Sequence, residues 1–451
     1  MSDAEDEQIE RTARQQTGAV ASRIEEIPAA DGADVLEDMS SERAADVAEY
    51  LDPDTAGRIL SEMDPVMAAS VLTDMEPAEA SMVVSAMAPD DAVDVLEHLP
   101  TSVHDAIVRE MGPAEAEEVR QLEQYPPDTA GGIMTPEVTA LREGFTVQQA
   151  IEELRALNEH LEQMFYVYVV DQRRHLVGVL SMRDLILAKP DRRISQIMRH
   201  DVASVPVTMD QEHVARLMRR NGYLAMPVVD ARNRLIGLVT ADDVADVIEE
   251  EATEDLQKMF GAGAEERLLS PWQFSFRKRI VWLEFNLATA FLAAWVISRF
   301  DKVIEVLPIL AAWQSIVSGM GGNAGAQALA VAIRGIAMGE TAPRLLSRVL
   351  YREFVVGLLT GITIGLTCWL CAMAGIFGHQ PHPAVLGFVV FLALLFNHIN
   401  ASVTGVLIPF AMKRLGFDPA QSSTIFATTF TDCGGFFATL WLAERFMQRL
   451  T

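Results

Sequence analysis

Residues 422–446 read SSTIFATTFTDCGGFFATLWLAERF, a stretch long enough to cross a bilayer, and Asp432 is its only charged residue before Glu444. A carboxylate near the centre of a bilayer costs several kcal/mol of free energy, so it normally faces a water-filled path or a bound cation. Asp432 therefore predicts that a membrane-spanning part of this chain handles cations.

The charges are divided unevenly along the chain. Residues 1–270 hold 55 Asp and Glu against 23 Lys and Arg, whereas residues 271–451 hold 8 against 13. A strongly acidic half attracts cations and repels nucleic acid, so we expect no nucleic-acid partner. The first ten residues, MSDAEDEQIE, lack the basic and apolar regions of a signal peptide. We therefore expect the acidic half to lie in the cytoplasm.

Prolines recur in the acidic half with nearly constant spacing. They are Pro53, Pro65, Pro77, Pro89, Pro100 and Pro113. Each is followed by small and apolar residues at helical spacing, and a proline in the first turn with an acid beside it is a helix start signal. The repeat predicts short helices that stack as a superhelix in an N domain over residues 1–125.

A duplication follows the repeat. The sequence GVLSMRD at 178–184 matches GLVTADD at 237–243, and the turn acids Asp171 and Asp230 are related by the same offset along the chain. Each unit has the pattern helix, strand, turn, strand, helix, with apolar β-branched strands and polar turns. The pair resembles tandem CBS domains, with one α/β unit over 126–198 and the other over 199–245.

The hydroxyl and the acid of each duplicated motif have two interpretations. By the resemblance to CBS domains, Ser181 and Thr240 would donate to a phosphate, and Asp184 and Asp243 would accept hydrogen bonds from ribose hydroxyls. The same residues can instead cap the helix that follows. The sequence leaves both interpretations open.

An acidic helical connector is predicted over residues 246–272. Asp243, Asp246, Glu250 and Glu254 fall at positions i, i+3, i+7 and i+11, which places them on one face of a helix. Like charges on one face destabilise a helix unless a cation neutralises them. A solvated face and a metal-binding face are both compatible with this pattern.

Five apolar stretches predict five membrane-spanning helices within residues 273–451. They cover about residues 280–300, 306–333, 353–377, 384–412 and 422–446. With the N-terminus inside, nine Lys and Arg flank the inner ends, and two, Arg299 and Lys302, lie in the outer loops, which supports this orientation. An odd number of spans then places the C-terminus outside.

Spans 2 and 5 carry polar residues that are unusual in lipid-facing helices. The glycines of GGNAGAQ at 321–327 weaken a helix and allow close approach, and irregular backbone is tolerated where it lines protein or water. We expect a path beside Asp432 to be lined by five residues of these spans. They are Gly322, Asn323, Gln327, Thr428 and Thr431.

Three roles are open to Asp432 itself. It pairs with a base inside the membrane, for which His398 is the candidate, it relays protons, or it binds a metal cation. Nearby hydroxyl groups and the acidic half of the chain favour the cation, because oxygen ligands suit hard metal ions.

The chain as a whole resembles the MgtE family of magnesium transporters. The motifs that carry the resemblance occur in order: YPPDTAGGIMT at 125–135, GGNAGAQ at 321–327, IPF at 408–410, DPA at 418–420 and the Thr431–Asp432 pair. Residues 397–402 read NHINAS and depart from the family pattern, so no contact of span 4 is carried over.

The resemblance implies a homodimer with a pore on its two-fold axis. Asp432 of both subunits would form the central ion site, and Asp418 would lie near the cytoplasmic mouth. The resemblance also implies that the connector acts as a plug and that Mg²⁺ bound among the soluble acids closes the pore. ATP binds the CBS pair of some members, which makes it a candidate regulatory ligand here.

The sequence thus predicts a multidomain membrane protein with a helical superhelix, an α/β CBS pair and a five-helix membrane domain. The leading hypothesis is import of Mg²⁺ down its gradient across a bacterial inner membrane, gated by cytoplasmic Mg²⁺. The alternatives are proton- or sodium-coupled transport of a divalent ion such as Co²⁺ or Mn²⁺, and a CBS-based sensor without transport. No nucleophile–base pair, Walker loop or zinc motif occurs, which argues against an enzyme.

Overall fold

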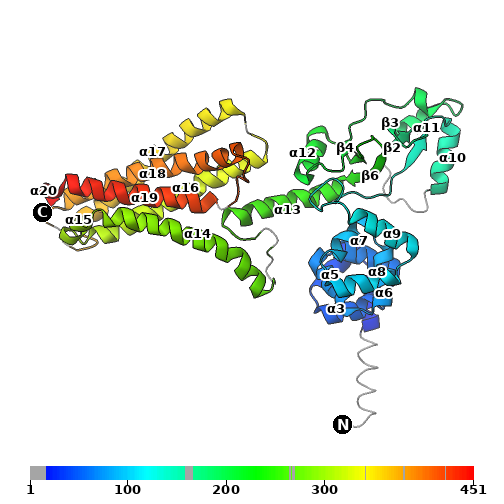
Figure 1. The fold of residues 1–451 in the computed structure, drawn as a ribbon, viewed down its shortest axis with the longest axis horizontal. Coiled ribbons are helices and arrows are strands. Elements are labelled where there is room, and N and C mark those ends of the chain that lie inside the picture. Colours follow the sequence, from blue (N-terminus) through cyan, green and yellow to red (C-terminus); the bar gives the residue numbers. More distant parts are fainter. Residues whose placement is uncertain are drawn as a thin grey trace, which may run out of the picture. The chain divides into compact units, whose positions relative to one another are not determined.

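The computed structural model describes residues 17–157, 166–263, 266, 270–340, 342–378, 381–421 and 423–450. Residues 1–16 of the predicted N domain and Ser422, the predicted start of the fifth span, lie outside the described residues. The chain divides into two compact units, Met1–Glu249 and Glu250–Thr451 (Figure 1).

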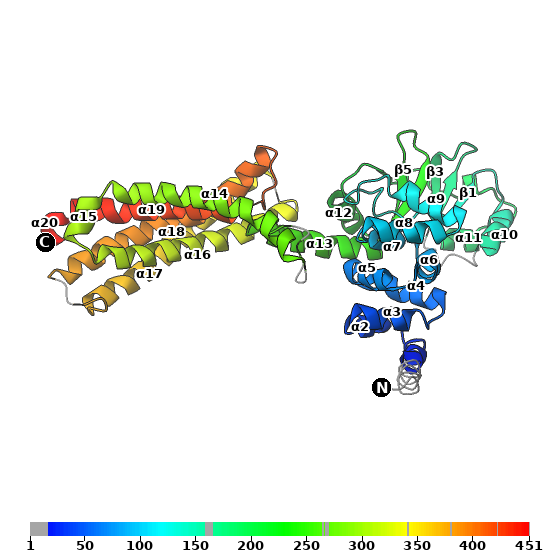
Figure 2. The same cartoon turned by 60° about the horizontal axis from the view of Figure 1, so that its bottom comes forward.

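Short stacked helices form the first part of unit 1 (Figure 2). They are α2 (Ala29–Glu37), α3 (Ser41–Ala48), α4 (Pro53–Ser61), α5 (Pro65–Asp74), α6 (Pro77–Ala86), α7 (Pro89–Leu96), α8 (Thr101–Glu110) and α9 (Pro113–Leu122). Five of the six predicted prolines occupy the first helical turn, where the missing N–H costs no hydrogen bond. The sixth, Pro100, is the N-cap of α8. The predicted helical superhelix is confirmed.

The period of the proline repeat determines which side chains meet in this core. Ala56, Ala68, Ala80 and Ala92 recur with that period, and each is at most 2% exposed. Each is followed three and four positions later by two buried aliphatic side chains, as in Ile59 and Leu60 of α4. The alanines let alternate helices such as α4 and α6 approach closely, and burial of each aliphatic side chain contributes roughly 1.5–3 kcal/mol.

Two three-stranded sheets follow. They contain β1 (Ala140–Arg142), β2 (Tyr166–Val170) and β3 (Leu176–Ser181), then β4 (Val205–Pro206), β5 (Ala225–Val229) and β6 (Leu235–Thr240). In each sheet the first pair of strands is parallel and the second pair antiparallel. Their helices are α10 (Val147–Leu157), α11 (Met182–Leu187), η1 (Ile194–Gln196), α12 (Gln211–Asn221) and α13 (Ala241–Met259). The offset of the repeated motif relates β2 to β5 and β3 to β6, so the duplication is confirmed; β1 and β4 were not predicted.

The segment that leads into each CBS unit pairs with the other unit. Thr135 pairs with Leu238 of β6, and Arg199 pairs with Val179 of β3. The sequence-based boundaries assigned Thr135 to the first unit and Arg199 to the second. The chain therefore crosses between the units before each of them begins, which a repeat offset alone does not reveal.

The glycine of each duplicated motif has a packing role in this crossing. A Cβ added to Gly237 would lie 2.8 Å from Cγ of Met134, and a Cβ added to Gly178 would lie 2.8 Å from Cγ of Met198. Both distances are too short for ordinary carbon contacts. Glycine therefore leaves room for the methionine of the crossing segment.

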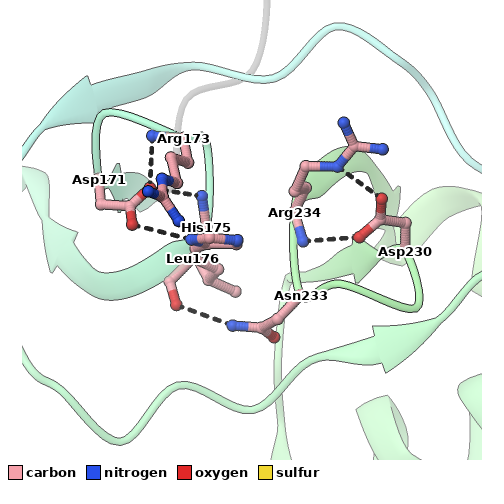
Figure 3. A network of polar contacts seen from close by, with 7 residues as sticks. All are labelled: Asp171, Arg173, His175, Leu176, Asp230, Asn233 and Arg234. Carbon is pink, nitrogen blue, oxygen red and sulfur yellow. Dashed lines mark hydrogen bonds and ion pairs between the residues drawn. The ribbon is translucent and has the colours of Figure 1, made fainter.

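The hairpin turns join the two CBS units edge to edge (Figure 3). The N–H of Leu176 donates to the carbonyl of Asn233 at 3.1 Å, and the side-chain amide of Asn233 donates to the carbonyl of Leu176 at 3.2 Å. Asp171 and Asp230 each accept hydrogen bonds from backbone N–H groups and from a basic side chain of their own turn. The acids with the shared offset therefore stabilise the turns.

Long helices form most of unit 2 and run side by side in both views (Figures 1 and 2). They are α14 (Trp272–Ser298), α16 (Leu310–Ala337), α17 (Pro343–Met373), α18 (Pro383–Arg414) and α19 (Ser423–Arg445), with the short helices α15 (Asp301–Val306) and α20 (Met447–Leu450). Helix α18 packs against α17, α16 and α19, and α19 also packs against α14 and α16.

Four helices of the described residues are long and apolar enough to cross a membrane: α14, α16, α17 from Arg344 onward, and α18. Helix α19 has 23 residues but is less apolar, because it contains Asp432 and several threonines. A fifth span therefore stays a prediction. The starts of α14 and α17 were predicted too late, near 280 and 353, because both helices extend through basic residues beyond the apolar stretch.

Span 2 is a regular helix, and the expected irregular backbone is not found there. Helix α16 continues from Leu310 to Ala337 through all of its glycines. The expected close approach is present, because a Cβ added to Gly405 of α18 would lie 2.7 Å from the carbonyl oxygen of Gly325. Small residues permit this backbone contact between membrane helices.

Candidate functional site

Asp432 lies half-buried on α19, where this helix packs against α16. Ser318 of α16 donates its hydroxyl to Oδ1 of Asp432 at 2.5 Å. A hydrogen bond to an ionised carboxylate is roughly twice as strong as a neutral one. Among the described residues, the partner of Asp432 is thus a neutral hydroxyl and not a base. His398, the base considered from the sequence, instead has Nδ1 2.9 Å from the carbonyl of Leu394.

An exposed polar stripe runs along α16. Ser315, Gly319, Asn323 and Gln327 recur at every fourth position and are all exposed. Residues three and four apart share a face of an α-helix, so Ser318 lies on the same side as Ser315. Polar groups on a membrane-spanning helix are costly against lipid. The stripe, with half-buried Gly322 beside it, therefore requires a second protein surface or water.

The two threonines predicted to line the path are placed differently. Thr428 is half-buried and lies one turn before Asp432 on the same face of α19. Thr431 is fully buried, and its hydroxyl donates to the carbonyl of Thr428 at 2.9 Å. Because consecutive helical residues point about 100° apart, Thr431 packs between α19 and α16 and does not line a surface.

A second cluster of carboxylates lies in unit 1. Asp90 and Asp91 at the start of α7 face Asp243 at the start of α13, with Glu62 and Asp242 close enough to interact electrostatically. Asp90 is 8% exposed, and its Oδ1 has no hydrogen-bond partner among the described residues. A buried, unpaired charge costs several kcal/mol, so this site favours a proton or a cation.

The raised pKa values of the cluster reflect the free-energy cost of burying these charges. Burial is the main cause that raises the pKa of Asp90 well above its ordinary value, and the Asp243 carboxylate adds to it. Burial also raises the pKa of Asp91 to about 6, although a hydrogen bond from Ser61 opposes the shift. The pKa of Asp243 is raised by burial against the hydrogen bonds from Thr240. We name Asp90, Asp91 and Asp243 the Asp90 cluster.

The sequence did not indicate Asp90 and Asp91 as candidate site residues. Acids directly after a proline at a helix start are usually exposed residues that interact with the helix dipole, which is how Asp90 and Asp91 after Pro89 would be interpreted. Only the closeness of the start of α7 to Asp243 shows that Asp90 is buried and Asp91 half-buried there. The local sequence carries no signal of this burial, because Asp90 and Asp91 are simply consecutive acids in the first turn of α7.

The four acids predicted on one face of the connector all lie on α13, in different surroundings. Asp243 belongs to the Asp90 cluster, and Asp246 is exposed, although partial burial of its carboxylate raises its pKa and Asp242 adds to the shift. Glu250 is exposed. Glu254 forms an ion pair with Lys258. Helix α13 also begins and ends earlier than the predicted bounds of 246–272, because the second CBS unit continues into it without a turn.

Asp418 shares its counter-ion with the end of α13. The ammonium of Lys258 lies 3.1 Å from Oδ2 of Asp418 and also pairs with Glu254. Met259 packs with Leu329 of α16 in the same region. Within unit 2, the C-terminal end of α13 is therefore attached to the loop that precedes α19.

The duplicated motifs cap helices. Ser181 accepts from the N–H of Asp184 and donates to its carboxylate at 2.7 Å, which lowers the pKa of Asp184. Thr240 donates in the same way to Asp243 at 2.5 Å. The capping interpretation is confirmed for Ser181 and Asp184, and nucleotide binding by the two motifs stays a prediction.

Comparison with known proteins places each part of the chain. Residues 314–442 match the family MgtE, described as a divalent cation transporter, residues 27–128 match the MgtE intracellular N domain, and residues 130–191 and 194–250 match CBS domains. The chain is 39% identical to a magnesium transporter MgtE of Enterococcus faecalis over 74% of its own length and 72% of the relative's. It is 36% identical to the protein of the same name from Thermus thermophilus over 75% and 74% of the two lengths.

Two solved structures are similar to about half of the chain. One is the cytosolic domain of the Mg²⁺ channel MgtE in complex with ATP, with 36% identity and a TM-score of 0.48 over 50% of this chain and 93% of that one. The other is the soluble part of a magnesium transporter, with 33% identity and a TM-score of 0.49 over 54% and 96%. From its matched domains and the length of the shared sequence, the chain belongs to the MgtE family of divalent cation transporters.

Proposed function

We propose that this multi-pass membrane protein is a channel-type transporter that imports Mg²⁺ down its electrochemical gradient. The observation that carries the proposal is the Ser318–Asp432 pair, a carboxylate held by a neutral hydroxyl within a bundle of apolar helices. Relatives named as magnesium transporters support Mg²⁺ as the cargo.

The exposed stripe of α16 supports a homodimer. Asn323 and Gln327 are too polar to face lipid, and a second copy of the chain would cover them and bring a second Asp432 to the same path. Mg²⁺ loses its water shell reluctantly, so two carboxylates that contact its coordinated waters would select it as a hydrated ion. A negative-inside potential of 100 mV supplies roughly 4.6 kcal/mol to a divalent ion, so no other energy source is required.

The Asp90 cluster is the proposed sensor of cytoplasmic Mg²⁺. Without a cation, Asp90, Asp91 and Asp243 repel one another and α7 separates from α13 more easily. A bound cation neutralises the cluster and holds the two helices together. This is a ligand that shifts a two-state equilibrium by its differential affinity.

Helix α13 provides the link from sensor to path. Asp243 lies in its first turn, and Lys258 near its last turn pairs with Asp418, which precedes α19. A cation at the cluster therefore restrains the same helix whose other end is attached to the membrane unit. The carboxylates of Asp246 and Glu250, exposed along α13, are candidates for further cation contacts.

Ion flux into reconstituted vesicles tests the transport proposal. With a membrane potential and no other gradient, we expect uptake of Mg²⁺ in preference to Co²⁺, Mn²⁺ and Ca²⁺. Empty vesicles provide the control. Uptake that occurs only with a pH or sodium gradient would favour the coupled transporter, and absence of flux for every ion would favour the sensor.

Nucleotide binding by the CBS pair is a further prediction. Opening of the Ser181–Asp184 and Thr240–Asp243 caps would free one hydroxyl and one carboxylate in each unit for phosphate and ribose. We expect ATP to bind the full chain in calorimetry and Asp184→Ala to weaken binding about tenfold, since one charged hydrogen bond is lost. Equal affinity of Asp184→Ala and of the matched variant Asp171→Ala would refute this role.

The proposed orientation places the N-terminus in the cytoplasm and the C-terminus outside a bacterial inner membrane. Arg334 at the end of α16 and Lys413 and Arg414 at the end of α18 support it, because basic residues concentrate at inner ends. Five spans, with α19 as the fifth, are required for the C-terminus to lie outside.

A further inference from the structure

Two asparagines of α18 contact the helices that carry the ion site. Asn397 is fully buried and donates its side-chain amide to the carbonyl of Val317 in α16 at 2.9 Å. Asn400 donates its amide to the carbonyl of Phe430 in α19, also at 2.9 Å. One helix is therefore hydrogen-bonded to the backbones of both helices that meet at the ion site.

Both contacts use the same local arrangement. Gly321 lies one helical turn after the accepting residue of α16, and Gly434 lies one turn after the accepting residue of α19. A Cβ added to Gly321 would lie 2.9 Å from Cγ of Asn397, and a Cβ added to Gly434 would lie 2.8 Å from Nδ2 of Asn400. Each glycine therefore opens a gap through which an amide reaches a backbone carbonyl.

The accepting carbonyls are adjacent to the functional pair. Val317 directly precedes Ser318, and Phe430 lies two positions before Asp432. We propose that Asn397 and Asn400 are positioning residues that fix the distance between Ser318 and Asp432. The inference rests on the proposed function of Asp432 as the ion site.

The chemistry of Asn397 indicates positioning and not stability alone. Its Oδ1 is buried and has no hydrogen-bond partner among the described residues. A buried acceptor without a partner destabilises the folded protein, which offsets part of what the bond to Val317 contributes to stability. What an apolar residue lacks is the directed bond to Val317. An ion site must be held within about 0.5 Å of its working geometry, and such bonds provide this precision.

A double-mutant cycle tests the inference. In reconstituted vesicles, we expect Asn397→Leu to raise the half-saturating concentration of Mg²⁺ about fivefold and to reduce the preference for Mg²⁺ over Ca²⁺, as expected for loss of one hydrogen bond. If Asn397 acts through Ser318, the variant with both Asn397→Leu and Ser318→Ala transports no worse than Ser318→Ala alone. A merely structural role would give additive losses.

Ser402→Ala is the matched control. Ser402 is a buried polar residue of the same helix, but its hydroxyl faces Gly357 of α17. We expect wild-type affinity and selectivity from it. If Asn397→Leu does not fold, Asn400→Leu with the same Ser318→Ala partner decides the question, because Asn400 is less buried.

Asp432→Asn in the same vesicles distinguishes failure of the proposed function from failure of the positioning inference. Wild-type uptake by Asp432→Asn would refute Asp432 as the ion site, and the proposed function would fail with it. If Asp432→Asn is inactive while Asn397→Leu and Asn400→Leu keep wild-type affinity and selectivity, or if the cycle is additive, the positioning inference alone is overturned.

Discussion

Asp432→Asn is expected to reduce Mg²⁺ uptake at least ~100-fold, since a divalent ion inside an apolar bundle loses several kcal/mol when its counter-charge is removed. The substitution keeps the shape of the side chain and an oxygen that accepts from Ser318, so the packing of α19 on α16 should be preserved. Uptake of Mg²⁺ into vesicles, with thermal unfolding to check the fold, measures the effect.

Glu444→Gln supplies the control for Asp432→Asn. It removes one carboxylate from the same helix, but at the exposed end of α19, away from Ser318. We expect near wild-type uptake from it. If both variants transport equally well, Asp432 is not on the ion path.

We expect the double substitution Asp90→Asn and Asp243→Asn to raise, at least roughly tenfold, the cytoplasmic Mg²⁺ concentration at which the current is halved. The reason is that two of the three carboxylates at the proposed sensor are lost. The start of α13 should survive the Asp243→Asn change, since the side-chain oxygen of Asn can still accept from the N–H and hydroxyl of Thr240. Currents from excised membrane patches, with the cytoplasmic face in the bath, give this concentration directly.

The pH dependence of closure follows from the same cluster. Burial raises the pKa of Asp91 to about 6, so the metal-free folded state takes up protons below that pH more readily than the unfolded chain does. The stability of the metal-free cluster is therefore greatest at acid pH and falls as the pH rises through about 6. Protons neutralise the same oxygens that Mg²⁺ would bind, so a smaller share of closure should depend on Mg²⁺ when the bath is acidified from pH 7.5 to 5.5.

Asp74→Asn is the matched control for the sensor. Asp74 is an exposed acid at the end of α5, outside the Asp90 cluster. Its replacement removes a charge from the same domain and should leave both the closing concentration and its pH dependence unchanged. Closure at the wild-type Mg²⁺ concentration in the Asp90 and Asp243 double variant would show that the sensor lies elsewhere.

The elements that were predictable from the sequence have local signals. Proline spacing placed most of the helices of the N domain, because proline fixes the first helical turn. The duplicated motifs placed β2, β3, β5 and β6, because a duplicated sequence repeats its strands. Asp432 was conspicuous because a single acid in an apolar stretch has few structural explanations.

The contacts that were missed depend on residues far apart in the chain. Ser318 and Asp432 are separated by 114 residues, and nothing in a serine of an apolar helix identifies its partner. Asn397 lies 80 residues from the carbonyl it contacts. The burial of Asp90 depends on α7 packing near the start of α13, and a charged residue in a polar repeat gives no sign of burial. The rotation of Thr431 away from Asp432 was the one error that helical geometry alone could have avoided.

Potential-driven uptake of Mg²⁺ distinguishes a channel built around Asp432 from a coupled transporter. Vesicles that contain wild type or Asp432→Asn would be given a negative-inside potassium diffusion potential, with equal pH and sodium on both sides. We expect rapid Mg²⁺ uptake by wild type that reverses when the potential is reversed, and no uptake by Asp432→Asn. Wild-type uptake that is independent of the potential, or equal in the two proteins, would contradict it.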